Sequence, residues 1–290
     1  IDFAVNGGYQ RIGAGFDGKG HRRAPEPSQG DLIDSDVWNV SGKLGAHIGD
    51  SGYLHGSLSY YRADQNSDYA SDPAPGRLPA GTALARPLKG LELADQNQVR
   101  NTVATLGYTN DDVLGSRVDV LGYYRKLFVR FTPFDARGVA TRGRNVDQVF
   151  QNSEIYGARL TVETPLGPRT ALTWGGDLGH EVSSMPLDVF DPAQYDASGG
   201  LVFDRTKTLI YMPKRTTKTQ GAFVQLRHRF ADFLSVEGGV RYDRAEASFD
   251  TFTPLSQSHL ANPFAVKGGK ISFDAWTFNA GAVVTPVAGQ

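Results

Sequence analysis

Hydrophobic and polar residues alternate with a period of two along most of this chain. In the segment SVEGGVRYDR, residues 235–244, Val236 and Val240 fall on even positions, whereas Glu237 and Arg241 fall on odd positions. Successive side chains of a β-strand point to opposite faces of the sheet, so this segment is predicted to be a strand with one apolar and one charged face. Similar runs begin near residues 3, 38, 54, 102, 156, 172, 222 and 276, and a less regular one spans residues 116–130. We therefore expect about ten strands, many long enough to cross a membrane.

The connections between the predicted strands alternate between short and long. The short ones are GDSG (49–52), NDDVLG (110–115), TPLGPR (164–169) and FAD (230–232), which are rich in turn residues. The long ones cover roughly residues 15–35, 65–96, 131–152, 185–216 and 250–270. This arrangement predicts an all-β fold: an antiparallel transmembrane β-barrel with short periplasmic turns and long extracellular loops, of which about ten strands are present.

Composition agrees with strands and turns. The 290 residues include 34 Gly, 12 Tyr and 16 Phe. The chain contains no run of roughly 20 apolar residues, which a membrane helix would need. The net charge of −1 provides no basic field for nucleic acid. The absence of cysteine excludes disulfides, thiolate metal sites and a cysteine nucleophile.

Tyr and Trp often fall near the ends of the predicted strands. An interfacial girdle would place them there, although aromatic residues also favour strands in any sheet. The residues concerned are Trp38, Tyr60, Tyr61, Tyr123, Tyr124, Tyr156 and Tyr242.

Alternation alone does not say which face of each strand points inward. In a soluble sandwich the apolar face forms the core, whereas in an outer-membrane barrel it faces lipid and the polar face lines the lumen. The long strands, the unequal connections and polar faces that carry both charge signs favour the barrel. The lumenal charges that would face a plug or water are Arg159, Glu163, Asp177, Arg227, Glu237 and Asp243.

The segment TKTQGAFVQLRHRFADFLSVEGGVRYDR, residues 217–244, resembles a strand–turn–strand segment of the TonB-dependent outer-membrane receptors. The run Phe278-Asn279-Ala280-Gly281 within residues 266–286 resembles a later strand of siderophore receptors in that family. The matching residues in the first segment are Gln220, Gly221, Phe223, Gln225, Gly238, Gly239, Arg241, Tyr242 and Asp243.

The family is expected to place an N-terminal plug domain inside a larger barrel. No plug or energy-coupling box is recognised here, and the chain ends in TPVAGQ without a terminal aromatic residue. We interpret residues 1–290 as part of a single TonB-dependent receptor barrel domain from which the plug domain and the C-terminal strands are absent.

The resemblance implies an outer-membrane receptor for TonB-dependent active uptake of a ferric siderophore. The implied partners are the siderophore, the TonB complex acting through the missing plug, and outer-membrane lipid and lipopolysaccharide. It implies no enzymatic activity, and no cofactor other than the iron carried by the ligand. The alternatives are a passive porin-like channel and, less favoured, a soluble β-rich carbohydrate-binding protein.

Three basic segments lie in predicted extracellular loops: GKGHRR (18–23), RGVATRGR (137–144) and DRTKTLIYMPKRTTK (204–218). They could contact lipopolysaccharide or aid solubility, or they could capture an anionic ferric chelate, since the guanidinium fork donates in pairs to oxygen ligands. Strand parity adds residues that share a lumenal register, and Arg241 is expected near the outer mouth of its strand. The predicted ligand-binding residues at this mouth are Tyr61, Tyr123, Arg125, Tyr211, Arg215 and Arg241.

Other motifs predict no chemistry. GAGFDG, residues 13–18, matches a dinucleotide fingerprint, but a loop-like segment follows it where a helix would be needed. The six histidines are scattered without metal-site spacing, and no G-x-S-x-G nucleophile elbow is present.

Overall fold

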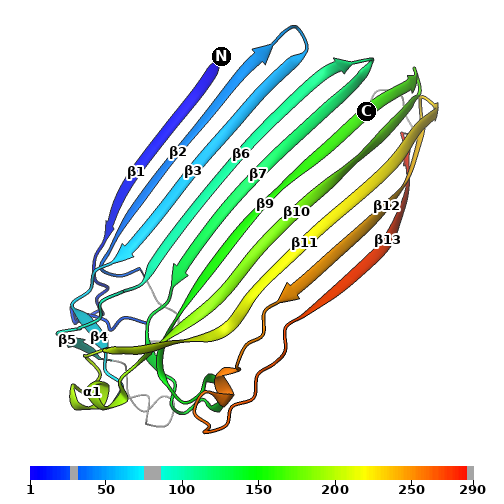
Figure 1. The fold of residues 1–290 in the computed structure, drawn as a ribbon. Coiled ribbons are helices and arrows are strands. Elements are labelled where there is room, and N and C mark those ends of the chain that lie inside the picture. The colour runs from blue at the N-terminus through cyan, green and yellow to red at the C-terminus, as the bar shows by residue number, and fades with distance from the viewer. Residues whose placement is uncertain (27–31, 75–85, 286–290) are drawn as a thin grey trace.

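One large antiparallel sheet dominates the structure (Figure 1), a computed structural model that describes residues 1–26, 32–74 and 86–285. Ten of its eleven strands form a meander in which neighbours in the sheet are also neighbours along the chain, and the short strand β8 (Phe134–Asp135) pairs with β9. The ten are β1 (Asp2–Ile12), β2 (Ser35–Ile48), β3 (Gly52–Gln65), β6 (Gln98–Val113), β7 (Ser116–Arg130), β9 (Val146–Gly167), β10 (Thr170–Phe190), β11 (Arg205–Ala231), β12 (Leu234–Phe249) and β13 (Gly269–Val284).

Short and long connections lie at opposite ends of the sheet, as predicted (Figure 1). The short turns cover residues 49–51, 114–115, 168–169 and 232–233. At the opposite end, which we call the outer end, the long connections carry the small elements of the fold. These are β4 (Tyr69–Ser71), β5 (Pro87–Lys89), η2 (Ala140–Arg142), α1 (Pro192–Ala197) and η3 (Leu255–Gln257).

Strands β9, β10 and β11 extend further at the outer end than the sequence pattern predicts. The predicted loops 131–152 and 185–216 are too long, because β9 already begins at Val146, β10 continues to Phe190 and β11 begins at Arg205. The pairing of β10 with β11 shifts register at Ser183–Pro186 and again at Val189–Phe190. These irregularities break the alternation that would have marked the extension as strand.

The extension is stabilised by loops packed on both of its faces. On one face, the fully buried Leu187 packs with Val149, Val189 and Leu255 of η3. On the other face, Val146 and Phe190 pack with Tyr195 of α1 and with Phe203. The buried core of the protein therefore lies at the outer end, where the loops cover the sheet.

Over the rest of the sheet, the apolar face is exposed. Leu106 and Leu178 are each 61% exposed and Phe278 is 77% exposed. A soluble sheet would bury this face, whereas an extended apolar surface of this kind suits contact with lipid. No helix among the described residues has the length and apolar character needed to cross a membrane.

Aromatic side chains gather on the exposed apolar face, from the outer parts of β1 and β2 to the middle of β12 and β13. Tyr9 packs against Trp38 with ring centroids 4.4 Å apart, and Tyr242 packs against Trp276 at 4.9 Å. Tyr60, Tyr124 and Tyr156 lie on the same face, as their pairing with Val40 and with each other shows. Tyr and Trp favour the boundary between hydrocarbon and water. This aromatic band therefore indicates where the sheet passes through the bilayer surface on the side of the long connections. Beyond it the same face carries charges, including Arg62, Lys126, Lys218 and Lys270.

A charge placed on the apolar face tests its contact with lipid. Leu106→Arg should lower the free energy of unfolding by about 2–4 kcal/mol, because an arginine near the bilayer midplane loses hydration. Thr173→Arg is the matched control, since Thr173 lies on the polar face opposite Glu163. Urea unfolding in lipid vesicles measures both changes, and equal losses in the two variants would contradict the assignment of the faces.

Candidate functional site

The polar face brings together nearly all the residues that the sequence analysis assigns to the lumen. Side chains of directly paired residues lie on the same face of a sheet. One such row runs from Tyr61 through Asn101, Ser153 and Ser183 to Arg215. The register places the other predicted lumenal residues on this face too: Tyr123, Arg125, Arg159, Glu163, Asp177, Arg227, Glu237, Arg241 and Asp243.

Arg241 forms a charge network in the middle of this face. Its Nη1 lies 2.9 Å from Oδ2 of Asp177 on β10, and its Nη2 lies 2.6 Å from Oδ1 of Asp243 on its own strand. The expected position of Arg241 at the outer mouth is wrong, because β12 continues to Phe249 and Arg241 lies near its middle. Arg241 thereby links β12 to β10 across the intervening strand β11.

Gly221 on β11 makes this network possible. It pairs with Asp177 on one side and with Asp243 on the other, so the Arg241 side chain passes over it. A Cβ at this position would lie 2.2 Å from Nη2 of Arg241, which is too close for any real contact. The glycine therefore leaves room for the Arg241 guanidinium, which a methyl group at this position would force to shift.

Other charges on the polar face are more loosely held. The Arg227 guanidinium lies 3.6 Å from Glu163, and both side chains are about half exposed. Arg159 is paired in register with Asp177 and Glu237 with Arg227. Neither Arg159 nor Glu237 forms an ion pair with another described residue. These groups leave charge available to whatever occupies the lumen.

Three of the predicted ligand-binding residues lie at the outer end of the polar face, in two groups separated along the sheet: Tyr61 and Arg125 on β3 and β7, and Arg215 on β11. Tyr61 is paired with Asn101, and Nε of Arg125 donates a hydrogen bond of 3.0 Å to the Asn101 side-chain oxygen. Arg215 lies 3.6 Å from Glu181 further along the same row. We call Tyr61, Asn101 and Arg125 the mouth cluster; sequence reasoning missed Asn101 in this cluster and Glu181 beside Arg215, because neither residue belongs to a motif.

The remaining predicted mouth residues lie elsewhere. Tyr123 lies deeper in the lumen over Gly157, where an added Cβ would meet its hydroxyl at 2.4 Å. Tyr211 lies on the extension of β11 with its ring 5.2 Å from the Arg142 guanidinium. Tyr61 and Tyr123 also fall on the polar face, so they do not belong to the aromatic band to which the sequence analysis assigned them.

Two arginines of the basic segment RGVATRGR are used to hold loops together. Arg137 lies between Asp135 and Asp196, with ion-pair distances of 2.7 Å to each, and these carboxylates raise its pKa. Arg142 binds the fully buried Asp147 and lies over the Phe134 ring at 4.6 Å. This segment therefore offers fewer free cations to a ligand than its sequence suggests.

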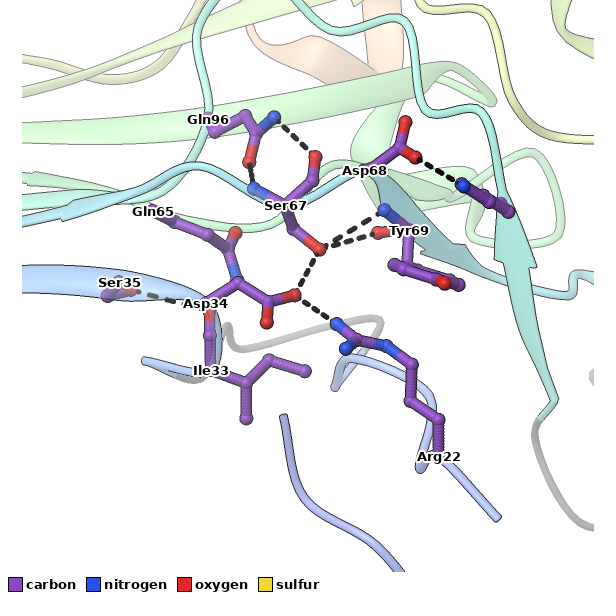
Figure 2. A network of polar contacts seen from close by, with 10 residues as sticks. Arg22, Ile33, Asp34, Ser35, Gln65, Ser67, Asp68, Tyr69 and Gln96 are labelled. Carbon is purple, nitrogen blue, oxygen red and sulfur yellow. Dashed lines mark hydrogen bonds and ion pairs between the residues drawn. The ribbon is translucent and has the colours of Figure 1, made fainter. Parts of the chain in front are cut away.

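The basic segment GKGHRR also contributes to loop structure (Figure 2). Arg22 pairs with Asp34, and its guanidinium lies 3.9 Å from the centroid of the Tyr69 ring. Ser67 donates a hydrogen bond of 2.6 Å to the same Asp34 carboxylate, which joins the connection before β2 to the one after β3. Asp34 itself has a φ of 53°, a left-handed conformation that aspartate adopts more readily than most residues. His21 likewise lies 3.1 Å from Asp17, and the backbone N–H groups of His21 and Lys19 lower the pKa of that aspartate.

No cluster of three or more potential ligands among the described residues could hold a metal ion. Residues 13–18 lie between β1 and β2, and Phe16 within them forms an isolated bridge with Arg22, with no helix following. A bound nucleotide phosphate would have no helix N-terminus here.

Comparison with known families assigns the fold. Residues 38–288 match the family described as TonB dependent receptor-like, beta-barrel. The chain belongs to this family, whose members are outer-membrane transporters rather than enzymes. The family match and the exposed apolar face both argue against the soluble carbohydrate-binding alternative.

The similar proteins include siderophore receptors. The chain is 27% identical to the rhizobactin receptor of Rhizobium meliloti (strain 1021), over 94% of this chain and 37% of that protein. It is 27% identical to the ferric aerobactin receptor of Klebsiella pneumoniae, over 95% of this chain and 39% of that protein. The chain thus spans less than half the length of these curated relatives.

Solved structures share the fold at lower identity. The copper transporter OprC matches with a TM-score of 0.62 at 14% identity, over 95% of this chain and 37% of that one. The FrpB iron transporter from Neisseria meningitidis (F5-1 variant, apoprotein form) matches with a TM-score of 0.57 at 16% identity, over 98% of this chain and 39% of that one.

Replacing Gly221 tests the Arg241 network. Gly221→Ala should lower the free energy of unfolding by about 1–3 kcal/mol, because the new methyl group displaces Arg241 from its carboxylates. Gly42→Ala is the control, since a Cβ there would meet only the Ala4 carbonyl oxygen at 3.9 Å. Urea unfolding in vesicles provides the comparison, and a Gly221 variant as stable as the Gly42 variant would show that Arg241 does not depend on the glycine.

Asp147 predicts a pH dependence at the outer end. Burial raises the pKa of Asp147 from 3.8 to about 6, despite the opposing effect of Arg142. The folded state therefore binds this proton more tightly than the unfolded state, and stability rises as the pH falls from above about 6 toward 3.8. Amide hydrogen exchange of residues 131–150, corrected for intrinsic rates, should show greater protection at pH 5 than at pH 7.

Asp147→Asn should remove that difference, because the amide is neutral at both pH values. Identical pH profiles in the two proteins would show that another group is responsible.

Proposed function

We propose that this chain is part of a receptor that takes up a ferric siderophore by TonB-dependent active transport. The observation that carries the proposal is the mouth cluster, which gathers an arginine, an amide and a phenol at the outer end of the lumenal face. The naming of two relatives as receptors for rhizobactin and for ferric aerobactin supports it. Membership of the receptor family favours this function over a passive porin-like channel.

Arg125 is the group best suited to contact the ligand. Among the residues that the structure describes, its side chain donates a hydrogen bond to the neutral Asn101 and forms no ion pair, so the guanidinium keeps its charge and most of its donors for a ligand. Iron chelators bind the metal through oxygen atoms, and a planar guanidinium donates to pairs of such oxygens. The Arg215–Glu181 pair is exposed and long, so a bound anion could replace the carboxylate as the partner of Arg215.

The charges deeper in the lumen suit contact with a plug. Arg159 and Glu237 face the lumen without ion pairs to described residues, while Arg227 and Glu163 form only a long one. We assign Arg159, Glu163, Asp177, Arg227, Glu237 and Asp243 to the surface that a plug domain would contact. In this proposal TonB acts on the plug, and the motion of the plug opens a path along these residues.

The same proposal makes residues 1–290 part of one barrel domain. Both β1 and β13 are edge strands of the described sheet, and unpaired backbone groups cannot face hydrocarbon. Further strands of the complete receptor would pair with these edges and close the barrel.

Arg125→Gln in the complete receptor tests the binding role. Loss of a charge-assisted hydrogen bond is worth about 1.5–3 kcal/mol, so the affinity should fall roughly ten- to a hundredfold. Binding is measured against a panel that includes ferric aerobactin and ferric rhizobactin, with Arg215→Ala as a second variant. Arg229→Gln is the matched control, because Arg229 shares the polar face but lies at the short-turn end of β11.

Two results would overturn the proposal. One is that no ferric siderophore in the panel binds the unmodified receptor, whereas another class of ligand does. The other is that the Arg125→Gln variant binds every ligand as tightly as the unmodified receptor, which would overturn only the role of Arg125 in binding.

A further inference from the structure

The lumenal face becomes apolar at the outer ends of β12 and β13. Five residues there share the face of Arg241, as the alternation along β12 and its register with β13 show. The two large side chains on β13 are more than half exposed, with Phe273 at 60% and Ile271 at 55%. We call the five residues the apolar rim patch: Ala245, Ala247 and Phe249 on β12, and Ile271 and Phe273 on β13.

Contact with lipid does not explain the apolar rim patch. On β13 the patch lies beyond Trp276 of the aromatic band, toward the outer end of the strand. The outward face at the same level is polar, and Nζ of Lys270 lies 2.5 Å from Oε2 of Glu246 there. The patch therefore lies on the water side of the band and on the face turned away from lipid.

A further strand beside β13 would leave the patch open. Such a strand pairs with the backbone edge of β13 in the plane of the sheet, whereas the patch lies on the face of the sheet. Phe252 of the following connection extends the apolar surface, since its ring centroid lies 6.2 Å from that of Phe249. Exposed apolar surface at the entrance of a transport protein favours a binding site for an apolar group.

A cation lies directly beside the patch. Arg215 on β11 is paired in register with Phe249, so the lumenal row that begins at Tyr61 continues through Arg215 into the patch. The Arg215 side chain is about half exposed, and its Nη2 lies 3.6 Å from Glu181, a long ion pair that an anionic ligand can replace. A cation and an apolar surface side by side match the two ends of an amphiphilic anion.

The patch is long and narrow. Ala245 and Phe249 lie about 14 Å apart along β12, because each residue of a strand adds about 3.4 Å. Across the sheet the patch is two strands wide, and Thr217 and Thr219 of β11 end it on one side. Asp243 ends it toward the membrane, where Arg241 binds this carboxylate. This shape suits a linear hydrocarbon chain rather than a compact chelate.

We propose that the apolar rim patch binds a hydrocarbon chain carried by the transported chelate, while Arg215 binds an anionic group of the same molecule. The inference rests on the proposed function and narrows its substrate to amphiphilic ferric chelates. Each methylene group that leaves water raises the affinity about fourfold. A chain of a few carbons on the patch therefore distinguishes such a chelate from one without a chain.

Two chelates that differ only in chain length test this chain subsite. The complete receptor in non-ionic detergent is titrated with a ferric trihydroxamate that carries an acetyl group and with the same chelate carrying an octanoyl group. Free concentrations are corrected for partition into micelles without receptor. We expect the octanoyl chelate to bind about tenfold more tightly or better, because two buried methylene groups already give about this factor.

The double variant Ile271→Thr/Phe273→Thr should reduce this preference to about threefold or less, because it removes most of the apolar surface of β13 from the patch. Threonine favours strands, so the ladder is retained. Val283→Thr is the matched control and should keep the full preference, since Val283 is an exposed lumenal residue at the short-turn end of the same strand. The resistance of each barrel to unfolding in dodecyl sulfate at room temperature confirms that the variants are folded.

A probe without iron tests the patch independently of transport. Octanoate with a diazirine at the end of its chain is photolysed with the receptor, and labelled peptides are identified by mass spectrometry. We expect labelling within residues 245–249 and 271–273, and its loss in the double variant but not in Val283→Thr.

The outcomes separate this inference from the proposed function. Chelates that bind equally well at both chain lengths would overturn the chain subsite and leave the receptor function standing. If neither chelate binds but octanoate labels the patch, the subsite stands and the proposed function fails for this class of chelate. Labelling confined to residues outside the patch, or a chain preference that the double variant retains, would overturn the inference.

Discussion

The requirement that every backbone N–H and C=O be paired between strands determines the rest of this structure. In hydrocarbon no water can satisfy a free backbone group, so the segment that crosses the membrane must be a continuous ladder. A continuous ladder imposes a strict period of two, which fixes the face of each side chain. The register from β1 to β13 keeps this parity across the membrane-spanning part. Along each strand, a residue that faces lipid is therefore followed by one that faces the lumen.

A second consequence is that lumenal side chains must share a crowded concave surface. Long side chains there extend sideways across neighbouring strands, and glycine on the neighbouring strand provides the space. Arg241 passes over Gly221 to reach Asp177, and Tyr123 lies over Gly157 in the same manner. Gly221 therefore leaves room for the side chain that crosses it, whereas at Gly157 an added Cβ would meet the Leu178 backbone oxygen at 2.2 Å, closer than the Tyr123 hydroxyl. The Arg241 charge network and the glycine at position 221 therefore depend on each other.

The sequence predicts the strands, the turns and the faces well, because all three depend on local alternation. The number of strands in the meander and the positions of the short turns agree with the pattern. The extension of β9–β11 could not be predicted in this way, because it depends on contacts such as Leu187 with Leu255, which are distant in sequence. The same limit applies to the loop arginines. Nothing local to Arg137 reveals that Asp196 compensates it, and nothing near Arg22 points to Asp34 as its partner.

These loop partners change where a ligand-binding charge can be found. An arginine between two carboxylates, such as Arg137, contributes to holding α1 against the connection before β9, and its donors are already occupied. An arginine that faces a neutral amide, such as Arg125, retains both its charge and its donors. Basic composition in a loop is therefore a poor guide to anion binding in this fold. The distinction that matters is whether each guanidinium already has a carboxylate partner, and it separates Arg125 from the arginines that hold the loops together.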